Sequence, residues 1–252
     1  MSVRLALTPD SRWEIDVEAL VPAARSAGFV GLGIPVTWVS EAARRAYDAA
    51  GLACHEIMAL IISGDAARTV AEAERLAVAA ETMAAPWINT VFRAAPSGET
   101  AELIARCAAI FAEAGSAMAV EFSPLGSLPG LSEAVEVAEM AGSGAAVLID
   151  TWHFSFGPST WADLEGLPAE RIAYIQFDDA PPPESGDLWE ETMQRRVMPG
   201  EGTLDLERFA VAVAATGFDG YVSLEVLNRE LRQLPAPSFL DRAFAATARY
   251  WS

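Results

Sequence analysis

The sequence has few cysteines and few basic residues, and both shortages exclude classes of protein. Its 252 residues include two cysteines, Cys54 and Cys107, which are too few for a disulfide scaffold in a chain of this length. We expect both to be buried, reduced side chains in a cytoplasmic protein. Lys and Arg total 17 against 35 Asp and Glu, and the resulting net charge of −18 disfavours nucleic acid and anionic membranes as partners.

Long apolar runs and a glycine-rich phosphate loop are also absent. No run of about 18 or more apolar residues occurs, so we expect no membrane-spanning helix. Thr8, Pro9 and Asp10 interrupt the first residues, which therefore lack the apolar segment of a signal peptide. The absence of a GxGxxG motif disfavours an open, doubly wound nucleotide-binding sheet.

What the sequence does contain is a regular alternation of short apolar runs with longer alanine-rich segments of helical spacing. Near-continuous apolar runs are typical of parallel strands covered on both faces. This rhythm predicts an α/β fold, a (β/α)8 TIM barrel formed as one domain by residues 1–252. The predicted strands are Arg4–Thr8, Phe29–Pro35, Ala53–Ile61, Trp87–Phe92, Ala117–Phe122, Ala146–Asp150, Ile172–Phe177 and Tyr221–Leu227; the clearest helices are Thr69–Ala84, Glu99–Gly115, Leu204–Thr216 and Phe239–Tyr250.

One connection departs from this rhythm. Residues 178–203 read DDAPPPESGDLWEETMQRRVMPGEGT, with three successive prolines and no clear period. The segment follows a strand end, where the active sites of barrels are built. We predict a functional lid, with an exposed surface loop as the alternative.

A polar side chain ends, or nearly ends, four successive apolar runs of the C-terminal half: Glu121, Asp150, Gln176 and Glu225. Strand ends converge at the mouth of a barrel, where carboxylates would repel one another unless a cation lay between them. Three carboxylates and one amide oxygen are ligands that suit Mg²⁺ or Mn²⁺. The alternative is that these acids pair with internal arginines, of which Arg4 and Arg93 lie in or beside predicted strands.

The two histidines and two adjacent arginines are further candidates. His153 follows Asp150 closely, which suits a group that contacts substrate or assists proton transfer, or else a structural histidine. His55, beside Glu56, is assigned either to substrate binding or to a structural role. Arg195 and Arg196 lie in the irregular segment, and we expect one of them to point inward and bind substrate oxygens.

At these positions the sequence resembles a known family. The segments LIDTWHF, YIQFDDA, RRVMPGEGTLDLERF and GYVSLEVLN make the chain from Glu121 onward similar to the sugar phosphate isomerase/epimerase family, the xylose isomerase-like TIM-barrel group. The resemblance implies one Mn²⁺, Mg²⁺, Co²⁺ or Zn²⁺ ion held by Glu, Asp, His and Glu. Glu121, Asp150 and Glu225 match, whereas Gln176 replaces the usual histidine and favours a harder ion, Mn²⁺ or Mg²⁺.

Gln176 and the stretch SLEVLNRELR are similar to the 3-dehydroshikimate dehydratase branch of this family. The endonuclease IV branch is disfavoured, because its additional histidines are missing and the charge is strongly acidic.

The favoured functional hypothesis is a metal-dependent isomerase or epimerase of a small sugar or cyclic polyol. Glu121 or Glu225 would remove the proton next to a carbonyl, the metal would stabilise the enediolate, and the other glutamate would return a proton. The alternative is a metal-dependent dehydratase, in which a β-hydroxyl then leaves as water. A third hypothesis is a catalytically inactive barrel used for binding. A homodimer is compatible with all three.

Overall fold

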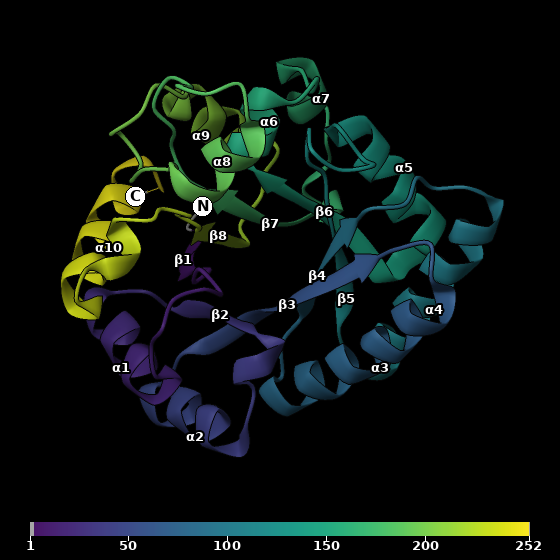
Figure 1. The fold of residues 1–252 in the computed structure, drawn as a ribbon, viewed down its shortest axis with the longest axis horizontal. Helices are drawn as coiled ribbons and strands as arrows, with labels where there is room; N and C mark the ends of the chain where they lie inside the picture. The colour runs from purple at the N-terminus through teal and green to yellow at the C-terminus, as the bar shows by residue number, and fades with distance from the viewer. Residues whose placement is uncertain (1–2, 252) are drawn as a thin grey trace.

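The computed structural model describes residues 3–251, and its centre is a closed barrel of eight parallel strands (Figure 1). The strands are β1 (Arg4–Leu7), β2 (Gly31–Pro35), β3 (Ala53–Ile62), β4 (Trp87–Phe92), β5 (Ala117–Glu121), β6 (Ala145–Asp150), β7 (Ile172–Phe177) and β8 (Tyr221–Leu224). Neighbours pair in chain order, and β8 pairs with β1, so the barrel has no free edge. The predicted (β/α)8 barrel is confirmed.

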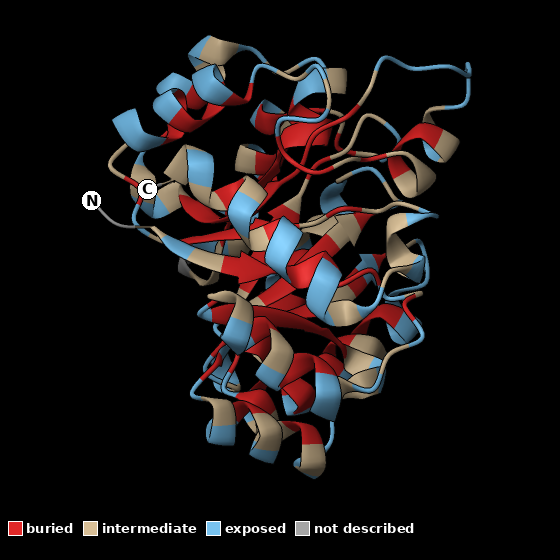
Figure 2. Ribbon diagram, turned by 90° about the vertical axis from the view of Figure 1, so that its left-hand side faces the viewer, coloured by how far each residue is buried: buried red, intermediate tan, exposed pale blue. Residues whose placement is uncertain are grey.

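Each predicted apolar run contains a strand, because both faces of the sheet are covered. Every residue of β2 and β7 is buried, and the strands form the buried centre of the molecule in Figure 2. The largest difference lies in the last run, where the strand ends at Leu224 rather than at Leu227. Glu225 therefore follows the strand directly instead of lying within it.

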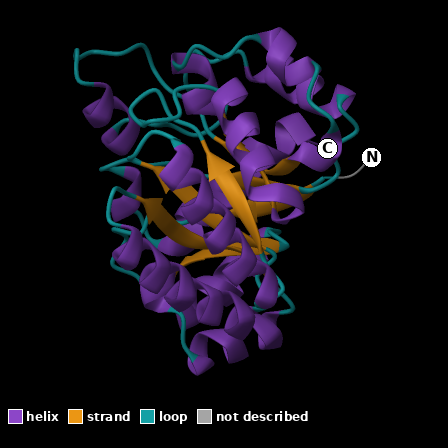
Figure 3. Ribbon diagram, turned by 90° about the vertical axis from the view of Figure 1, so that its right-hand side faces the viewer, coloured by secondary structure: helices purple, strands orange, loops and turns teal. Residues whose placement is uncertain are grey.

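Helices surround the barrel, as Figure 3 shows. They are α1 (Val17–Ala27), α2 (Glu41–Ala50), α3 (Ala66–Met83), α4 (Gly98–Glu113), α5 (Leu131–Ala141), α6 (Thr151–Phe156), α7 (Trp161–Glu165), α8 (Leu188–Gln194), α9 (Leu206–Ala215) and α10 (Ala236–Trp251), with short 3-10 turns at Val36–Trp38, Gly142–Gly144, Ala169–Arg171 and Leu231–Gln233. The four helices predicted from spacing are α3, α4, α9 and α10, with ends moved by a few residues. None of the helices in the described part of the chain is long and apolar enough to cross a membrane.

Local signals account for where several helices begin and end. Asp16, Ser40 and Asp65 precede α1, α2 and α3, and each side chain accepts a hydrogen bond from a backbone N–H of the first turn. Gly28 ends α1 with a φ of 116°, a conformation that favours glycine. These caps fix where the helices begin and end.

The irregular segment after β7 is more ordered than predicted. Residues 178–203 include the helix α8, and an antiparallel bridge joins Asp179 to Val197. The Asp179 carboxylate accepts hydrogen bonds from the backbone N–H groups of Gly200, Gly202 and Leu204. The segment is exposed only in part, because residues 182–187 are exposed whereas Arg196 and Met198 are buried.

The barrel interior is partly polar. Thr8, His55, Glu56 and Ser223 are buried there, and the Glu56 carboxylate accepts hydrogen bonds from the hydroxyls of Thr8 and Tyr174. A buried carboxylate needs such partners, because its desolvation is costly. Cys54 and Cys107 are both buried and unbridged, as predicted.

Gly33 on β2 makes room for Glu56. A Cβ atom at position 33 would lie 2.5 Å from Oε1 and 2.8 Å from Cγ of Glu56, which is held by its hydrogen bonds. We expect Gly33→Ala to lower the free energy of unfolding by about 1–3 kcal/mol, measured by urea denaturation. The matched control is Gly64→Ala, because no described atom lies within 4 Å of the added methyl group. Equal stability of the two variants would refute this account of the interior packing.

Candidate functional site

The four polar residues predicted from the strand ends meet at one end of the barrel. Glu121 and Asp150 are the last residues of β5 and β6, Gln176 is the second-last residue of β7, and Glu225 follows β8. Asp150 pairs in register with Gln176, and Gln176 pairs with Ser223. The carboxyl ends of barrel strands carry the active sites of this architecture.

A cavity of about 490 Å³ opens at this end of the barrel. Glu121, Gln176 and Glu225 line it, together with Asn89 and several residues of the surrounding loops. Asp150 is not part of the lining and is 1% exposed. A larger hollow of about 590 Å³ is lined by residues of α3 and α4, away from the strand ends. The site is therefore a cavity lined by three acids, Asp10, Glu121 and Glu225, and two amides, with Asp150 buried beside it.

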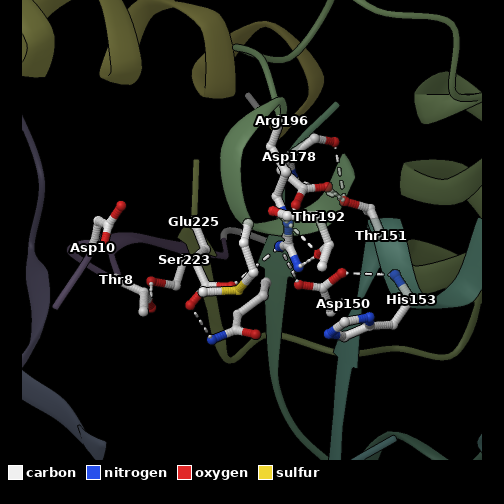
Figure 4. A network of polar contacts seen from close by, with 12 residues as sticks. Thr8, Asp10, Asp150, Thr151, His153, Asp178, Thr192, Arg196, Ser223 and Glu225 are labelled. Atoms are coloured by element: carbon white, nitrogen blue, oxygen red, sulfur yellow. Dashed lines mark hydrogen bonds and ion pairs between the residues drawn. The ribbon is translucent and has the colours of Figure 1, made fainter. Parts of the chain in front are cut away.

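Glu121 is held by two neighbours. Asn89 Nδ2 donates a hydrogen bond to Oε2 at 2.7 Å, and His153 Nε2 lies 3.1 Å from Oε1. His153 is in turn positioned by Asp150, whose Oδ1 accepts the backbone N–H of His153 at 2.8 Å as the N-cap of α6. Figure 4 shows this bond. The structure thus brings the predicted residue His153 to the site.

Arg196 lies at the centre of a buried acidic cluster (Figure 4). Its Nη1 is 2.7 Å from Asp150 Oδ2, 2.5 Å from Asp178 Oδ2 and 3.1 Å from Glu225 Oε2. Arg195 points elsewhere, to Glu184 and Glu191 on its own segment, and its side chain is 23% exposed. Arg196 is therefore the inward-facing member of the pair. The alternative that these acids pair with an internal arginine describes Asp150 and Glu225, but the arginine is Arg196 rather than Arg4 or Arg93.

Burial and mutual repulsion make the three carboxyl groups of the cluster unequal. Burial raises the pKa of Asp178 to about 7, with Asp150 adding to the shift and Arg196 opposing it. Burial also raises the pKa of Glu225 well above its usual range, against the effect of Arg196. Burial acts in the same direction on Asp150, but Arg196 and His153 outweigh it and lower the pKa of that carboxyl. The pKa values of Asp150 and Glu225 are thus shifted in opposite directions, although both carboxyl groups contact the same guanidinium.

The predicted metal ligands do not form a ligand shell in this arrangement. Within residues 3–251, no three His, Cys, Asp or Glu side chains are grouped so that they could hold a metal ion. Arg196 Nη1 takes the position between Asp150 and Glu225. Gln176 Nε2 lies 3.3 Å from Glu225 Oε1 as a donor, while its Oε1 is buried without a hydrogen-bond partner among the described residues. The amide oxygen suits a ligand; of the three predicted carboxylate ligands, Asp150 and Glu225 contact the guanidinium of Arg196, whereas Glu121 contacts Asn89 and His153.

His55 is placed away from the cavity. It is fully buried in the barrel interior, with its ring against those of Tyr174 and Tyr221. Its Nε2 lies 3.3 Å from Glu56 Oε1, without the geometry of a hydrogen bond. This position supports the structural interpretation of His55 rather than contact with substrate.

Sequence reasoning missed two residues of the site. Asp178 directly follows β7, and Thr151 Oγ1 donates to its Oδ1 at 2.6 Å. Asn89 lies within β4 and contacts Glu121. Asp178 could have been found as a further acid at a strand end, in the run QFDD. Nothing in the sequence around Asn89 distinguishes it from an ordinary strand residue.

Segments of the chain are similar to two kinds of characterised enzyme. A segment of 101 residues is 34% identical to a 3-dehydroshikimate dehydratase from Pseudomonas aeruginosa and covers 40% of this chain but 16% of that protein. A segment of 132 residues is 29% identical to an inosose isomerase from Halalkalibacterium halodurans and covers 51% of this chain and 46% of that protein. The matches thus span less than half of either relative.

Among solved structures, the barrel superimposes on the IolI protein crystallised with a bound zinc atom. The TM-score is 0.87 at 17% identity, and the alignment covers 99% of this chain and 100% of the other. This likeness shows the shared fold. The family model for xylose isomerase-like TIM barrels matches residues 21–245, which is most of the chain. The chain therefore belongs to the xylose isomerase-like TIM-barrel family.

Proposed function

We propose that this protein is an isomerase or epimerase that removes the proton next to the carbonyl of a small sugar or cyclic polyol. The observation that carries the proposal is that Glu121 and Glu225, from opposite ends of the C-terminal half of the sequence, line one cavity at the carboxyl end of the barrel. Two carboxyl groups in one cavity can act as base and acid on one substrate carbon. The isomerases and dehydratases among the relatives support an enzymatic role.

The two glutamates take different roles in this proposal. Glu121, held by Asn89 and His153, is the base that takes the proton from the carbon next to the carbonyl. The electron pair of that C–H bond forms a carbon–carbon double bond, and the π electrons of the carbonyl group move onto its oxygen, which leaves an enediolate. Glu225, whose pKa is raised by burial, is the acid that returns a proton to the opposite face or to the neighbouring carbon.

Neutral donors at the cavity wall would bind the oxygens of the substrate. Asn89 and Gln176 both line the cavity, and their amide groups can donate to a carbonyl or accept from a hydroxyl. His153 lies close enough to Glu121 to share a proton with it.

A dehydratase of the 3-dehydroshikimate type is the second candidate. It is favoured by the 34% identity to the Pseudomonas aeruginosa enzyme over 101 residues. Glu121 would remove the same kind of proton, the bond between the β-carbon and its hydroxyl would break, and Glu225 would protonate the departing oxygen as water. The first step is shared, so the fate of the enolate separates the two reactions.

Replacement of either glutamate should stop proton transfer. We expect Glu121→Gln and Glu225→Gln to slow the exchange of solvent deuterium into an inosose by about 10²–10⁴-fold, measured by NMR. The matched control is Glu190→Gln, because Glu190 is a half-exposed partner of Arg229 outside the cavity. Near-normal exchange in either cavity variant would remove that glutamate from the mechanism.

The choice of substrate separates the two reactions. With an inosose in D₂O, an isomerase or epimerase should incorporate deuterium without loss of water. With 3-dehydroshikimate, a dehydratase should form a conjugated product that absorbs ultraviolet light. We expect the first result and not the second; the reverse would select the dehydratase, and no reaction with either compound would favour a barrel that only binds.

A further inference from the structure

A second hollow lies beside the cavity of the candidate site. Its volume is about 350 Å³, and it is lined by residues from the end of β3, from the first three turns of α3 and from the position directly after β4. Ala59 and Ile61 line both this hollow and the cavity that contains Glu121 and Glu225. The two spaces therefore share a wall, which is formed by a small side chain and by an isoleucine that is 40% exposed.

Three arginines, Arg68, Arg75 and Arg93, line this second space, which we call the arginine hollow. Arg68 and Arg75 are seven residues apart on α3, so they lie on the same face of the helix. Arg93 follows β4, and its backbone N–H donates to the carbonyl of Ile62 at 2.9 Å, which fixes it beside the end of β3. Guanidinium groups from two separate elements thus border one space.

The charges in the arginine hollow are not balanced within the chain. Among the described residues that line it, Glu72 is the one acid, and it accepts two hydrogen bonds from Arg75, at 3.0 and 2.5 Å. Neither Arg68 nor Arg93 forms an ion pair with an acid of residues 3–251. Three arginines against one glutamate leave an excess of two positive charges, in a chain whose net charge is −18.

This combination suits an oxyanion better than a neutral ligand. A guanidinium binds phosphate and carboxylate groups through a planar pair of N–H donors. The hydroxyls of Ser63 and Thr69 line the same space and are further donors. Salt screens the acidic surface beyond about 8–10 Å, so the nearby arginines dominate the field that a bound anion experiences.

We propose that the arginine hollow is an oxyanion subsite, which binds a phosphate or carboxylate group of the substrate while the carbonyl end of the same molecule lies in the cavity. The shared wall of Ala59 and Ile61 supports this arrangement, because a ligand needs to pass only these two side chains to occupy both spaces. The inference rests on the proposed function for the reaction and narrows its substrate to an acidic derivative of a sugar or cyclic polyol.

The first test measures anion binding and does not depend on turnover. Inorganic phosphate and acetate are titrated separately into the wild type by calorimetry, at an ionic strength held constant with NaCl. We expect saturable binding, and the tighter of the two anions identifies the preferred group. The double variant Arg68→Gln, Arg93→Gln should bind that anion at least about tenfold more weakly.

Arg45→Gln is the matched control for the loss of a positive charge. Arg45 is an exposed arginine of α2 and does not line the hollow, so this variant should bind the anion as the wild type does. The replaced side chains are all exposed, and we expect every variant to melt within about 2 °C of the wild type. Wild-type protein that binds neither anion, or binding that survives in the double variant, would overturn the proposal.

The second test compares substrates by the exchange of solvent deuterium, followed by NMR. The compounds are D-fructose 6-phosphate, D-fructuronate and neutral D-fructose, which carry the carbonyl near one end and, in the first two, a charge at the other. We expect kcat/KM for the better acidic ketose to exceed that for D-fructose by at least about tenfold. The double variant should raise the KM for that ketose more than the KM for D-fructose.

The two tests separate the subsite from the reaction. Equal kcat/KM values for the neutral and acidic ketoses would overturn the proposed substrate class. If none of the ketoses exchanges deuterium while anion binding still depends on Arg68 and Arg93, the proposed reaction fails and the oxyanion subsite stands. Exchange that is insensitive to the double variant, without anion binding, would leave the reaction and remove the subsite.

Discussion

The carboxyl end of this barrel depends on how the charges of three buried carboxyl groups are compensated. Asp150, Asp178 and Glu225 converge from neighbouring strands, and the guanidinium of Arg196 lies among them. The barrel geometry makes this convergence unavoidable once acids occupy those strand ends. The other oxygen of Asp150 accepts the backbone N–H of His153 and caps α6. This cap places His153 beside Glu121.

The segment after β7 has a structural role that its composition conceals. The segment is rich in proline, glycine and charged residues, yet it contains Arg196, whose guanidinium is buried at the end of the barrel. Thr192 on α8 holds one side of the guanidinium, and the bridge between Asp179 and Val197 returns the chain to the barrel directly after Arg196. The segment is therefore fixed near its centre, and it contributes Met193 to the lining of the cavity.

Much of the fold follows from local sequence patterns. Which side chains of the site contact one another does not. Apolar runs predict the strands because a strand that is buried on both faces consists almost entirely of apolar residues. Neighbouring residues with the same chemistry are indistinguishable in sequence: Asp178 contacts Arg196, while Asp179 binds backbone N–H groups of residues 200–204. Arg195 and Arg196 divide in the same way, because their directions depend on where α8 ends and on a bridge between distant residues.

The glutamine at position 176 connects the family resemblance with the chemistry of this chain. A histidine there would offer one nitrogen to a metal and could itself become charged. The side-chain amide of glutamine stays neutral, and it both donates and accepts hydrogen bonds. It donates to Glu225, which also contacts Arg196, so two neutral or cationic donors of the chain act on one carboxyl group. The amide of Gln176 and the guanidinium of Arg196 therefore act together in holding the Glu225 side chain at the edge of the cavity.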